Sequence, residues 1–442
     1  MKRSPQPHPT DRLATLFAVF FGAFLGLSLL KFGNPCILEY LVVSPSTVYE
    51  WLLNSWPVTL GYGLLAGFAL LGFLVRSRQA HLSPGLLVPA LIWLAWQFIS
   101  AAGSVNAGLT NATLEHFTAC LACFFIGGYV LSRAKPELFL AGLAAGLMTV
   151  ILVGWQQHFG GLAETRKYFF LYIYPQMRTV PPELLKKMSS DRIFSTLFYP
   201  NTLASVLLLL LPASLATMWL QRARFTAGAR ALLVGLLGLG GLGCLYWSKS
   251  KGGWLLMLIL GLVALLRMRF AQRTKIILVG AILVVGLAGF AWRFAGYFQK
   301  GATSAVARGD YWHAAVATAL ANPVLGTGPG TFAIPYAKIK KPGSEMARLV
   351  HNDYLQQASD SGLVGGAAYL VFVAGSLWVG WRRLAPQGDW LKFSVWLGLL
   401  GWSLQGFVEF GLYIPAVAWP GFALMGWLLA SGNGVDNRAA NA

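Results

Sequence analysis

The sequence predicts an all-α integral membrane protein, a polytopic bundle of about 12 transmembrane helices with two long extracytoplasmic loops. Of its 442 residues, 56% are hydrophobic and only 11% are charged, far outside the composition of soluble proteins. Runs such as 203–211 and 276–290 are apolar on every side, whereas strands of a transmembrane barrel alternate apolar and polar residues. These observations exclude a soluble enzyme, a disordered chain and a barrel.

Twelve apolar segments of roughly bilayer length account for the predicted spans. In the first half of the chain they are Leu13–Leu30, Pro57–Val75, Leu86–Ala102, Phe117–Leu131, Leu138–Trp155 and Asn201–Leu220. In the second half they are Ala231–Trp247, Gly252–Leu266, Ile276–Trp292, Leu363–Trp381, Trp390–Phe407 and Leu412–Leu429. Because the number is even, both termini are expected on the same side of the membrane.

Lysine and arginine in the short connections identify the cytoplasmic side. With the N-terminus in the cytoplasm, the cytoplasmic segments carry 18 of the 34 basic residues and four acids. These basic residues are Lys2, Arg3, Arg12, Arg76, Arg78, Arg133, Lys135, Arg222, Arg224, Arg230, Arg267, Arg269, Arg273, Lys275, Arg382, Arg383, Lys392 and Arg438. We therefore expect both termini in the cytoplasm.

Of the 16 remaining basic residues, Lys31 lies alone and the other 15 gather in two long loops and one turn on the opposite side. We treat 1–442 as a single polytopic domain composed of the first spans, a first long loop at 156–200, core spans at 201–292 with a basic outer turn at 248–253, a large loop at 293–362, and the last three spans with a short tail at 363–442. Long connections are usually functional or disordered. Their Trp, Tyr and Pro content favours function over a solvated linker.

The segment Ser190–Ala204 leads from the first long loop into a predicted span. Arg192 is expected at the outer membrane surface, where an arginine binds either an anion or, by snorkelling, lipid headgroups. Pro200 and Asn201 match the start of a helix, with Asn201 as its side-chain cap. Because a helix N-terminus favours a nearby anion, this segment is a candidate anion site.

Two lysines and two glycines form the basic outer turn. Lys249 and Lys251 supply positive charge, and the glycines permit close approach to the backbone. An anion site and a pair of interfacial lysines beside membrane-belt Trp residues are equally open interpretations.

The large loop begins with an amphipathic pattern in which Trp312, Val316 and Leu320 recur every four residues, and an Asn-Pro pair ends it. This pattern predicts a surface helix. The Gly-rich loop that follows, 323–330, is neither a G-x-G-x-x-G fingerprint nor a Walker motif, so nucleotide binding is not expected.

His351 lies in a polar patch shortly before the span that begins at Leu363. Imidazole groups in general titrate near neutral pH and suit proton abstraction, although a lone histidine is more often structural. His313 is a weaker candidate because it falls on the predicted surface helix. The six histidines and four cysteines form no metal-site cluster and no disulfide framework.

Taken in order, these segments resemble the O-antigen ligase and O-antigen polymerase superfamily of bacterial membrane glycosyltransferases, from about Arg192 to Gly366. The resemblance rests on Arg192 with Phe198–Ala204, Ser250-Lys251-Gly252, Arg308 with Trp312, Pro323–Gly328, and His351–Leu355 followed by Gly362-Leu363. The family commonly has an arginine where this chain has Lys251, which keeps the charge but loses the bidentate geometry. Lys249 is an alternative for this role.

The resemblance implies a GT-C-like bundle and a metal-independent, inverting glycosyltransferase without a cofactor. Such an enzyme would move a glycan from polyprenyl (undecaprenyl) pyrophosphate to an acceptor hydroxyl on the periplasmic side of the bacterial inner membrane. The pyrophosphate-binding residues would be Arg192, Lys249, Lys251 and Arg308.

The resemblance also implies that His351 acts as general base on the acceptor hydroxyl. Asn352 or Asp353 would orient His351, and Asn201 and Tyr354 would support the site.

Within the superfamily only the acceptor differs. We expect an O-antigen ligase that joins O-antigen to lipid A core; an O-antigen or exopolysaccharide polymerase is the alternative, and a protein O-oligosaccharyltransferase is less favoured. The expected partners are a polyprenyl-pyrophosphate-linked glycan, lipid A core or a growing glycan, and membrane lipids, with no nucleic acid. A transporter or flippase of an anionic polyprenyl-linked lipid would place charges at the bilayer midplane, whereas these spans are almost free of charge.

Overall fold

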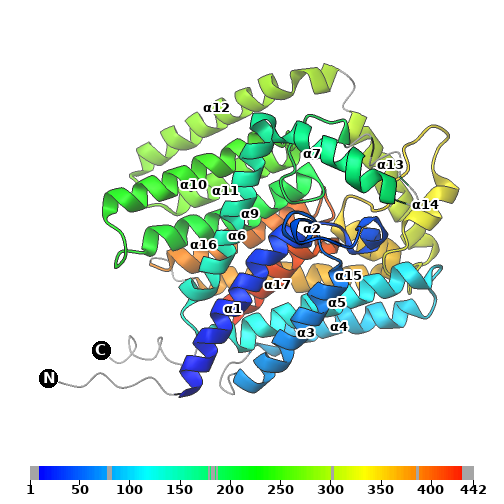
Figure 1. The fold of residues 1–442 in the computed structure, drawn as a ribbon, viewed down its shortest axis with the longest axis horizontal. Coiled ribbons are helices and arrows are strands. Elements are labelled where there is room, and N and C mark those ends of the chain that lie inside the picture. Colours follow the sequence, from blue (N-terminus) through cyan, green and yellow to red (C-terminus); the bar gives the residue numbers. More distant parts are fainter. Residues whose placement is uncertain are drawn as a thin grey trace.

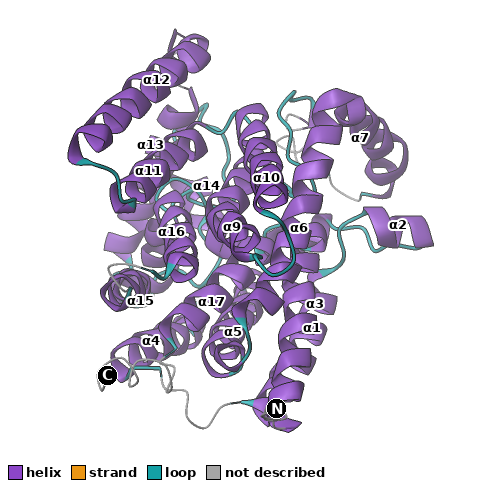
Figure 2. Cartoon of the chain, turned by 90° about the vertical axis from the view of Figure 1, so that its left-hand side faces the viewer, coloured by secondary structure: helices purple, strands orange, loops and turns teal. Residues whose placement is uncertain are grey.

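The computed structural model describes residues 9–76, 82–177, 180, 185, 188–299, 303–384 and 388–430. Helices and loops make up these residues, and none of them forms a strand (Figure 1, Figure 2). Four residues used in the charge argument, Lys2, Arg3, Arg78 and Arg438, lie outside the described ranges.

Nine helices of the described chain are long and apolar enough to cross a membrane. They are α1 (Pro9–Lys31), α3 (Val58–Val75), α4 (Pro84–Ala101), α5 (Ala107–Tyr129), α6 (Pro136–Gln156), α9 (Pro200–Leu220), α10 (Ala227–Trp247), α12 (Gln272–Gln299) and α15 (Asp353–Arg383). The other three predicted spans are shorter helices of 17, 16 and 15 residues, namely α11 (Lys251–Arg267), α16 (Trp390–Gln405) and α17 (Pro415–Leu429). The predicted all-α membrane bundle is confirmed.

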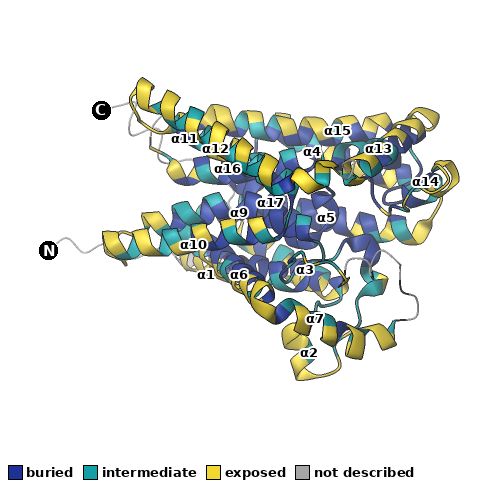
Figure 3. Cartoon of the chain, turned by 90° about the horizontal axis from the view of Figure 1, so that it is seen from above, coloured by how far each residue is buried: buried dark blue, intermediate teal, exposed yellow. Residues whose placement is uncertain are grey.

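The shortest of these helices lies inside the bundle, because every residue of α17 is buried (Figure 3). Glycines allow α17 to pack closely against α5. A Cβ atom on Gly426 would lie 1.9 Å from the carbonyl oxygen of Phe124, and one on Gly127 would lie 2.1 Å from that of Ala423. Small residues let membrane helices approach each other in this way.

Shorter helical segments occupy the connections. They are η1 (Cys36–Leu41), α2 (Val48–Leu53), η2 (Leu131–Arg133), η3 (Gln157–Gly161), α7 (Leu162–Tyr168), η4 (Phe169–Ile173), η5 (Tyr174–Gln176), α13 (Thr303–Ala321), α14 (Ala333–Ile339) and η6 (Gly411–Tyr413). The large loop is therefore largely helical.

Helix α13 confirms the helix predicted at the start of the large loop, but it packs through a different face. Val316 and Leu320 of the predicted apolar stripe are exposed, whereas Tyr311, Ala315 and Thr318 are buried. Trp312, the first residue of the stripe, is half-buried against this face. The second half of the stripe faces away from the protein, because α13 packs there through the small side chains of Ala315, Thr318 and Ala319.

Helix α5 begins at Ala107, ahead of the predicted start at Phe117. The added turns contain Thr110, Thr113 and His116, all of which are buried. A hydropathy pattern misses such turns, because their polar side chains are covered by protein rather than by lipid.

Helix α15 begins at Asp353 and is kinked next to Gly362, so the predicted span is only its second part. The Gly-rich loop packs on this kink, where the N–H of Gly328 donates to the carbonyl oxygen of Asp360 at 2.8 Å. Gly362 has φ +70°, and a Cβ there would lie 2.1 Å from the carbonyl oxygen of Val324. The glycines thus permit close backbone packing.

Candidate active site

A cavity of about 440 Å³ lies where five segments of the chain meet. Its walls come from the segment after α1, the end of the first long loop with the start of α9, α13, the loop before α15 and the connection between α16 and η6. Four of the sequence-predicted site residues line it, namely Arg192, Asn201, Arg308 and His351. The cavity therefore brings together the first long loop and the large loop.

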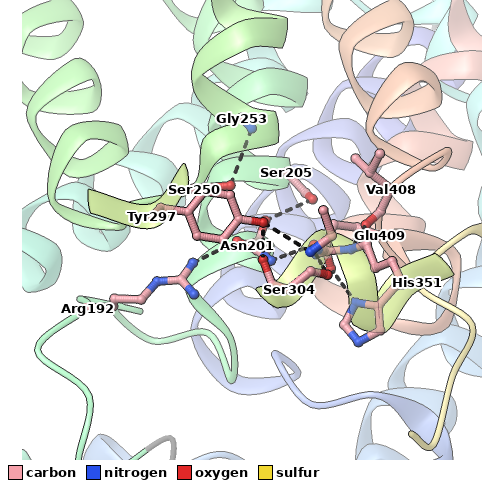
Figure 4. A network of polar contacts seen from close by, with 12 residues as sticks. Arg192, Asn201, Ser205, Ser250, Gly253, Tyr297, Ser304, His351, Val408 and Glu409 are labelled. Carbon is pink, nitrogen blue, oxygen red and sulfur yellow. Dashed lines mark hydrogen bonds and ion pairs between the residues drawn. The ribbon is translucent and has the colours of Figure 1, made fainter. Parts of the chain in front are cut away.

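Glu409 contacts three of these side chains, and Figure 4 shows it beside Asn201 and His351. Its side chain is only 7% exposed and lies between α16 and η6. One carboxylate oxygen, Oε1, accepts hydrogen bonds from Asn201 Nδ2 and Arg308 Nη2. The other, Oε2, lies 3.1 Å from His351 Nδ1. A single buried carboxylate thus joins α9, α13 and the loop before α15.

The environment of Glu409 keeps this carboxylate ionised. Burial alone would raise its pKa, but Arg308 and His351 oppose that effect electrostatically and through hydrogen bonds. The net result is a pKa of about 2, well below the ordinary value of 4.5. A buried negative charge is held here because cationic and hydrogen-bonding partners surround it.

Arg308 projects from α13 and is held at three points. Its Nη2 pairs with Glu409, its Nε donates to the carbonyl oxygen of Val408 at 3.1 Å, and its Nη1 donates to that of Ser304 at 3.3 Å. The side chain is 20% exposed. Arg308 therefore presents a fixed positive charge at the edge of the cavity.

Arg192 approaches the cavity from the first long loop. Its Nε donates to the carbonyl oxygen of Ser248, and its Nη2 donates to Asn201 Oδ1, both at 2.8 Å. Burial lowers the pKa of Arg192, while the negative charge of Glu409 acts in the opposite direction. The guanidinium stays ionised at neutral pH, so two arginines border the same space.

His351 has a left-handed backbone conformation, with φ +55°. This conformation is uncommon for a residue other than glycine and is concentrated at functional sites. The ring lies between Tyr311 and Phe410, with centroid distances of 5.9 and 4.6 Å, and the side chain is 29% exposed. Because Nδ1 faces Glu409, Nε2 is the nitrogen left for a substrate; within the described chain it has no hydrogen-bond partner.

The three residues after His351 hold the helix rather than the imidazole ring. Asn352 Oδ1 caps α15 by accepting from the N–H groups of Tyr354 and Leu355 at 3.0 Å. Asp353 Oδ2 accepts from the N–H of Leu412 at 3.1 Å. The hydroxyl of Tyr354 donates to the carbonyl oxygen of Ser403, also at 3.0 Å. None of these contacts reaches the ring of His351; the carboxylate within hydrogen-bond distance of that ring is Glu409, rather than Asp353.

The two lysines of the basic turn lie beside the cavity rather than in its wall. Lys249 forms an ion pair with Asp191, next to Arg192 in the chain. Lys251 begins α11, and its Nζ lies 3.8 Å from the ring centroid of Tyr297. Burial lowers the pKa of Lys251 to about 8, and the like charges of Arg192 and Arg308 act in the same direction. Three neighbouring cations that repel one another favour the binding of an anion.

Asn201 differs from the prediction that it caps α9. The N-cap position belongs to Tyr199, and no side chain caps the helix there. The helix starts where the sequence predicted, but Pro200 occupies its first position and the side chain of Asn201 bridges Arg192 and Glu409. The amide can satisfy both a donor and an acceptor, and the two charged partners outcompete the backbone N–H groups.

Sequence reasoning missed Glu409, although one signal pointed to it. Between Trp390 and Ala430 it is the single acidic residue, and the stretch from 393 to 430 contains no other charged residue. An ionisable residue in such a stretch suggests a functional role, but its partners are far away in the sequence.

Fold and site together define a polytopic helical membrane protein whose cavity combines two arginines with a histidine–carboxylate pair. Residues 236–370 match the family model described as O-Antigen ligase. The match confirms the resemblance to the O-antigen ligase and polymerase superfamily and implies a glycosyltransferase-like enzyme. It includes Arg308 and His351, whereas Arg192 and Glu409 lie outside it. No curated protein matches the chain.

Proposed function

We propose that this protein is an O-antigen ligase of the bacterial inner membrane, with both termini in the cytoplasm. It transfers a glycan from undecaprenyl pyrophosphate to a hydroxyl of lipid A core at the periplasmic face. The observation that carries this proposal is the cavity in which Arg192 and Arg308 border the same space as the His351–Glu409 pair. Such a site combines two cationic side chains, which stabilise an anionic leaving group, with an imidazole that accepts a proton.

In the proposed reaction, the acceptor oxygen attacks the anomeric carbon of the donor and forms the new glycosidic bond with inversion. The bond between that carbon and the phosphate oxygen breaks, and polyprenyl pyrophosphate leaves with the electron pair. The proton of the acceptor hydroxyl passes to Nε2 of His351, which is free because Nδ1 faces Glu409. Glu409 stabilises the imidazolium that forms, as carboxylates do beside catalytic histidines.

The arginines support the departure of the pyrophosphate. Negative charge on the bridging oxygen grows as the glycosidic bond breaks, and fixed positive charges near that oxygen lower the barrier. Arg192 and Arg308 are held by hydrogen bonds before the donor arrives, so little reorganisation is needed. Lys251 adds a third positive charge from the adjacent turn, and Lys249 a fourth farther out. We propose a metal-independent reaction because side-chain cations already supply this stabilisation.

The test uses purified protein in nanodiscs, with a polyprenyl-pyrophosphate glycan incubated with and without lipid A core. We expect transfer to the core. Lengthening of the lipid-linked glycan without core would identify a polymerase instead. Movement of an unmodified donor from one leaflet to the other in proteoliposomes, without any product, would identify a transporter.

His351→Ala should reduce kcat by about 100-fold or more while the donor still binds. Arg192→Ala should mainly raise the donor KM. His313→Ala is the matched control, because His313 is exposed on α13 and does not line the cavity. Full transfer by folded His351→Ala protein would exclude His351 as the base, and an unchanged donor KM in Arg192→Ala protein would remove Arg192 from the pyrophosphate site.

A further inference from the structure

A second cavity, of about 230 Å³, lies directly beside the first. The two cavities share Leu41 and Phe198 in their walls. The second is formed by the loop after α1, by the helical segments that continue α6, and by the stretch that follows Arg192. It is therefore the immediate neighbour of the proposed pyrophosphate site.

The second cavity differs from the first in the polarity of its walls, because the first is lined by charged side chains and the second, within the described chain, is not. Its described lining contains no charged residue and is mostly apolar, with Leu53, Phe169 and Met188 among its walls. Three hydroxyl groups of the wall are engaged within the protein, since Thr196 donates to the carbonyl oxygen of Leu29, Ser195 to that of Val150 and Thr165 to that of Gly161. A cavity with such walls suits an apolar ligand.

The helical segments that contribute to the walls of the second cavity also carry apolar side chains on the protein surface. Leu52 and Leu53 on α2 are 72% and 69% exposed, and Leu171 and Tyr172 on η4 are 57% and 55% exposed. Helices α2 and α7 lie at one edge of the bundle (Figure 3). Exposed apolar and aromatic residues of this kind favour contact with lipid at the membrane interface, so a lipid chain in the cavity can continue into the bilayer.

We propose that the second cavity binds the first isoprene units of the donor, an inference that rests on the proposed function. In a polyprenyl pyrophosphate, the first isoprene carbon is bonded directly to a phosphate oxygen. The chain must therefore leave the pyrophosphate site at once. The stretch 192–198 leads from one cavity to the other, because Arg192 lines the first, Phe194 the second and Phe198 both. The acyl chains of a glycolipid acceptor are separated from its reacting hydroxyl by several sugars, so they have no reason to lie next to the pyrophosphate.

Binding without transfer tests this inference separately from the proposed function. Farnesyl pyrophosphate and inorganic pyrophosphate are titrated into nanodisc protein, because they share the anionic group and differ in the chain. Val43→Trp fills the second cavity, and Val48→Trp is its matched control, because Val48 is 83% exposed and does not line the cavity.

We expect wild-type protein and Val48→Trp to bind farnesyl pyrophosphate at least about 10-fold more tightly than inorganic pyrophosphate. Val43→Trp should remove most of this difference and leave the Kd of inorganic pyrophosphate unchanged. Equal affinities in wild-type protein, or an undiminished difference in Val43→Trp, would overturn the assignment of the isoprene site. If Val43→Trp raises the KM for lipid A core and leaves the Kd of farnesyl pyrophosphate unchanged, the cavity belongs to the acyl chains of the acceptor instead. If wild-type protein binds farnesyl pyrophosphate as expected but transfers nothing, the proposed function fails and the isoprene site stands.

Discussion

Glu409→Gln removes one negative charge from the centre of the cavity while keeping a side chain of nearly the same shape. The pKa of this carboxyl falls from an ordinary 4.5 to about 2. At about 1.4 kcal/mol per pH unit, the folded protein stabilises the ionised form by about 3 kcal/mol. Because the pKa is lowered in the folded protein, this contribution to the free energy of unfolding is complete above pH 4.5 and is lost as the pH falls toward 2. The whole contribution is therefore present at pH 7.

An independent argument gives a similar magnitude. Glu409 and Arg308 are 7% and 20% exposed, and removing one partner of a buried ion pair costs about 3–5 kcal/mol. We expect denaturant unfolding in detergent to show a loss of about 3 kcal/mol for Glu409→Gln. The kcat for transfer should fall by about 100-fold or more, because His351 loses the group that orients it. The donor KM should not rise, because Arg308 is released from an internal partner.

Asp389→Asn is the matched control for this substitution. Asp389 pairs with Lys392 at 3.2 Å near the surface, and an exposed pair of this kind contributes about 0.2–1 kcal/mol. Stability and kcat should therefore change little. If Glu409→Gln is as stable as Asp389→Asn, the buried charge cluster does not hold these segments together. If its kcat is unchanged, the carboxylate does not orient the base.

Three further predictions concern the surroundings of the cavity. The donor KM of the wild-type enzyme should rise above about pH 8, because Lys251 has its pKa lowered to about 8 and loses its charge as the pH increases; a KM profile of Lys251→Arg should stay flat in that range. Gly362→Ala should destabilise the protein by about 1–3 kcal/mol in denaturant unfolding, because φ is +70° and the added Cβ would meet the carbonyl oxygen of Val324. Gln356→Ala should lower kcat without raising the donor KM, because Gln356 Oε1 accepts from the N–H of Val350 at 2.7 Å and fixes the turn before the base.

The sequence predicted the membrane helices well, because lipid requires every spanning backbone to satisfy its own hydrogen bonds in long apolar segments. The starts of α5 and α15 were less predictable. In α5, Thr110 and His116 are buried by other helices, and a hydropathy window cannot distinguish burial by protein from exposure to water. The cations Arg192 and Arg308 and the base candidate His351 were predicted from local motifs and do line one cavity.

The partner of these residues could not be predicted in the same way. Glu409 is 208 residues from Asn201, 101 from Arg308 and 58 from His351 in the sequence. Local patterns contain no information about such pairings, and Asn352 and Asp353 were the nearest polar candidates. Asn352 instead satisfies N–H groups at the start of α15, and Asp353 satisfies that of Leu412 in η6. Backbone N–H groups at helix starts lack a partner within the helix.

The hydrogen bonds of the two arginines give them different parts in the proposed reaction. Within the described chain, Arg192 uses two of its five N–H groups and Arg308 uses three, one of them on Glu409. Arg192 therefore has more donors available for the incoming pyrophosphate. When His351 accepts the proton, its new positive charge competes with Arg308 for the Glu409 carboxylate. The ion pair between Glu409 and Arg308 therefore weakens while the pyrophosphate gains negative charge, and Arg308 interacts with that charge instead. In this proposed reaction, one carboxylate couples proton acceptance to stabilisation of the leaving group.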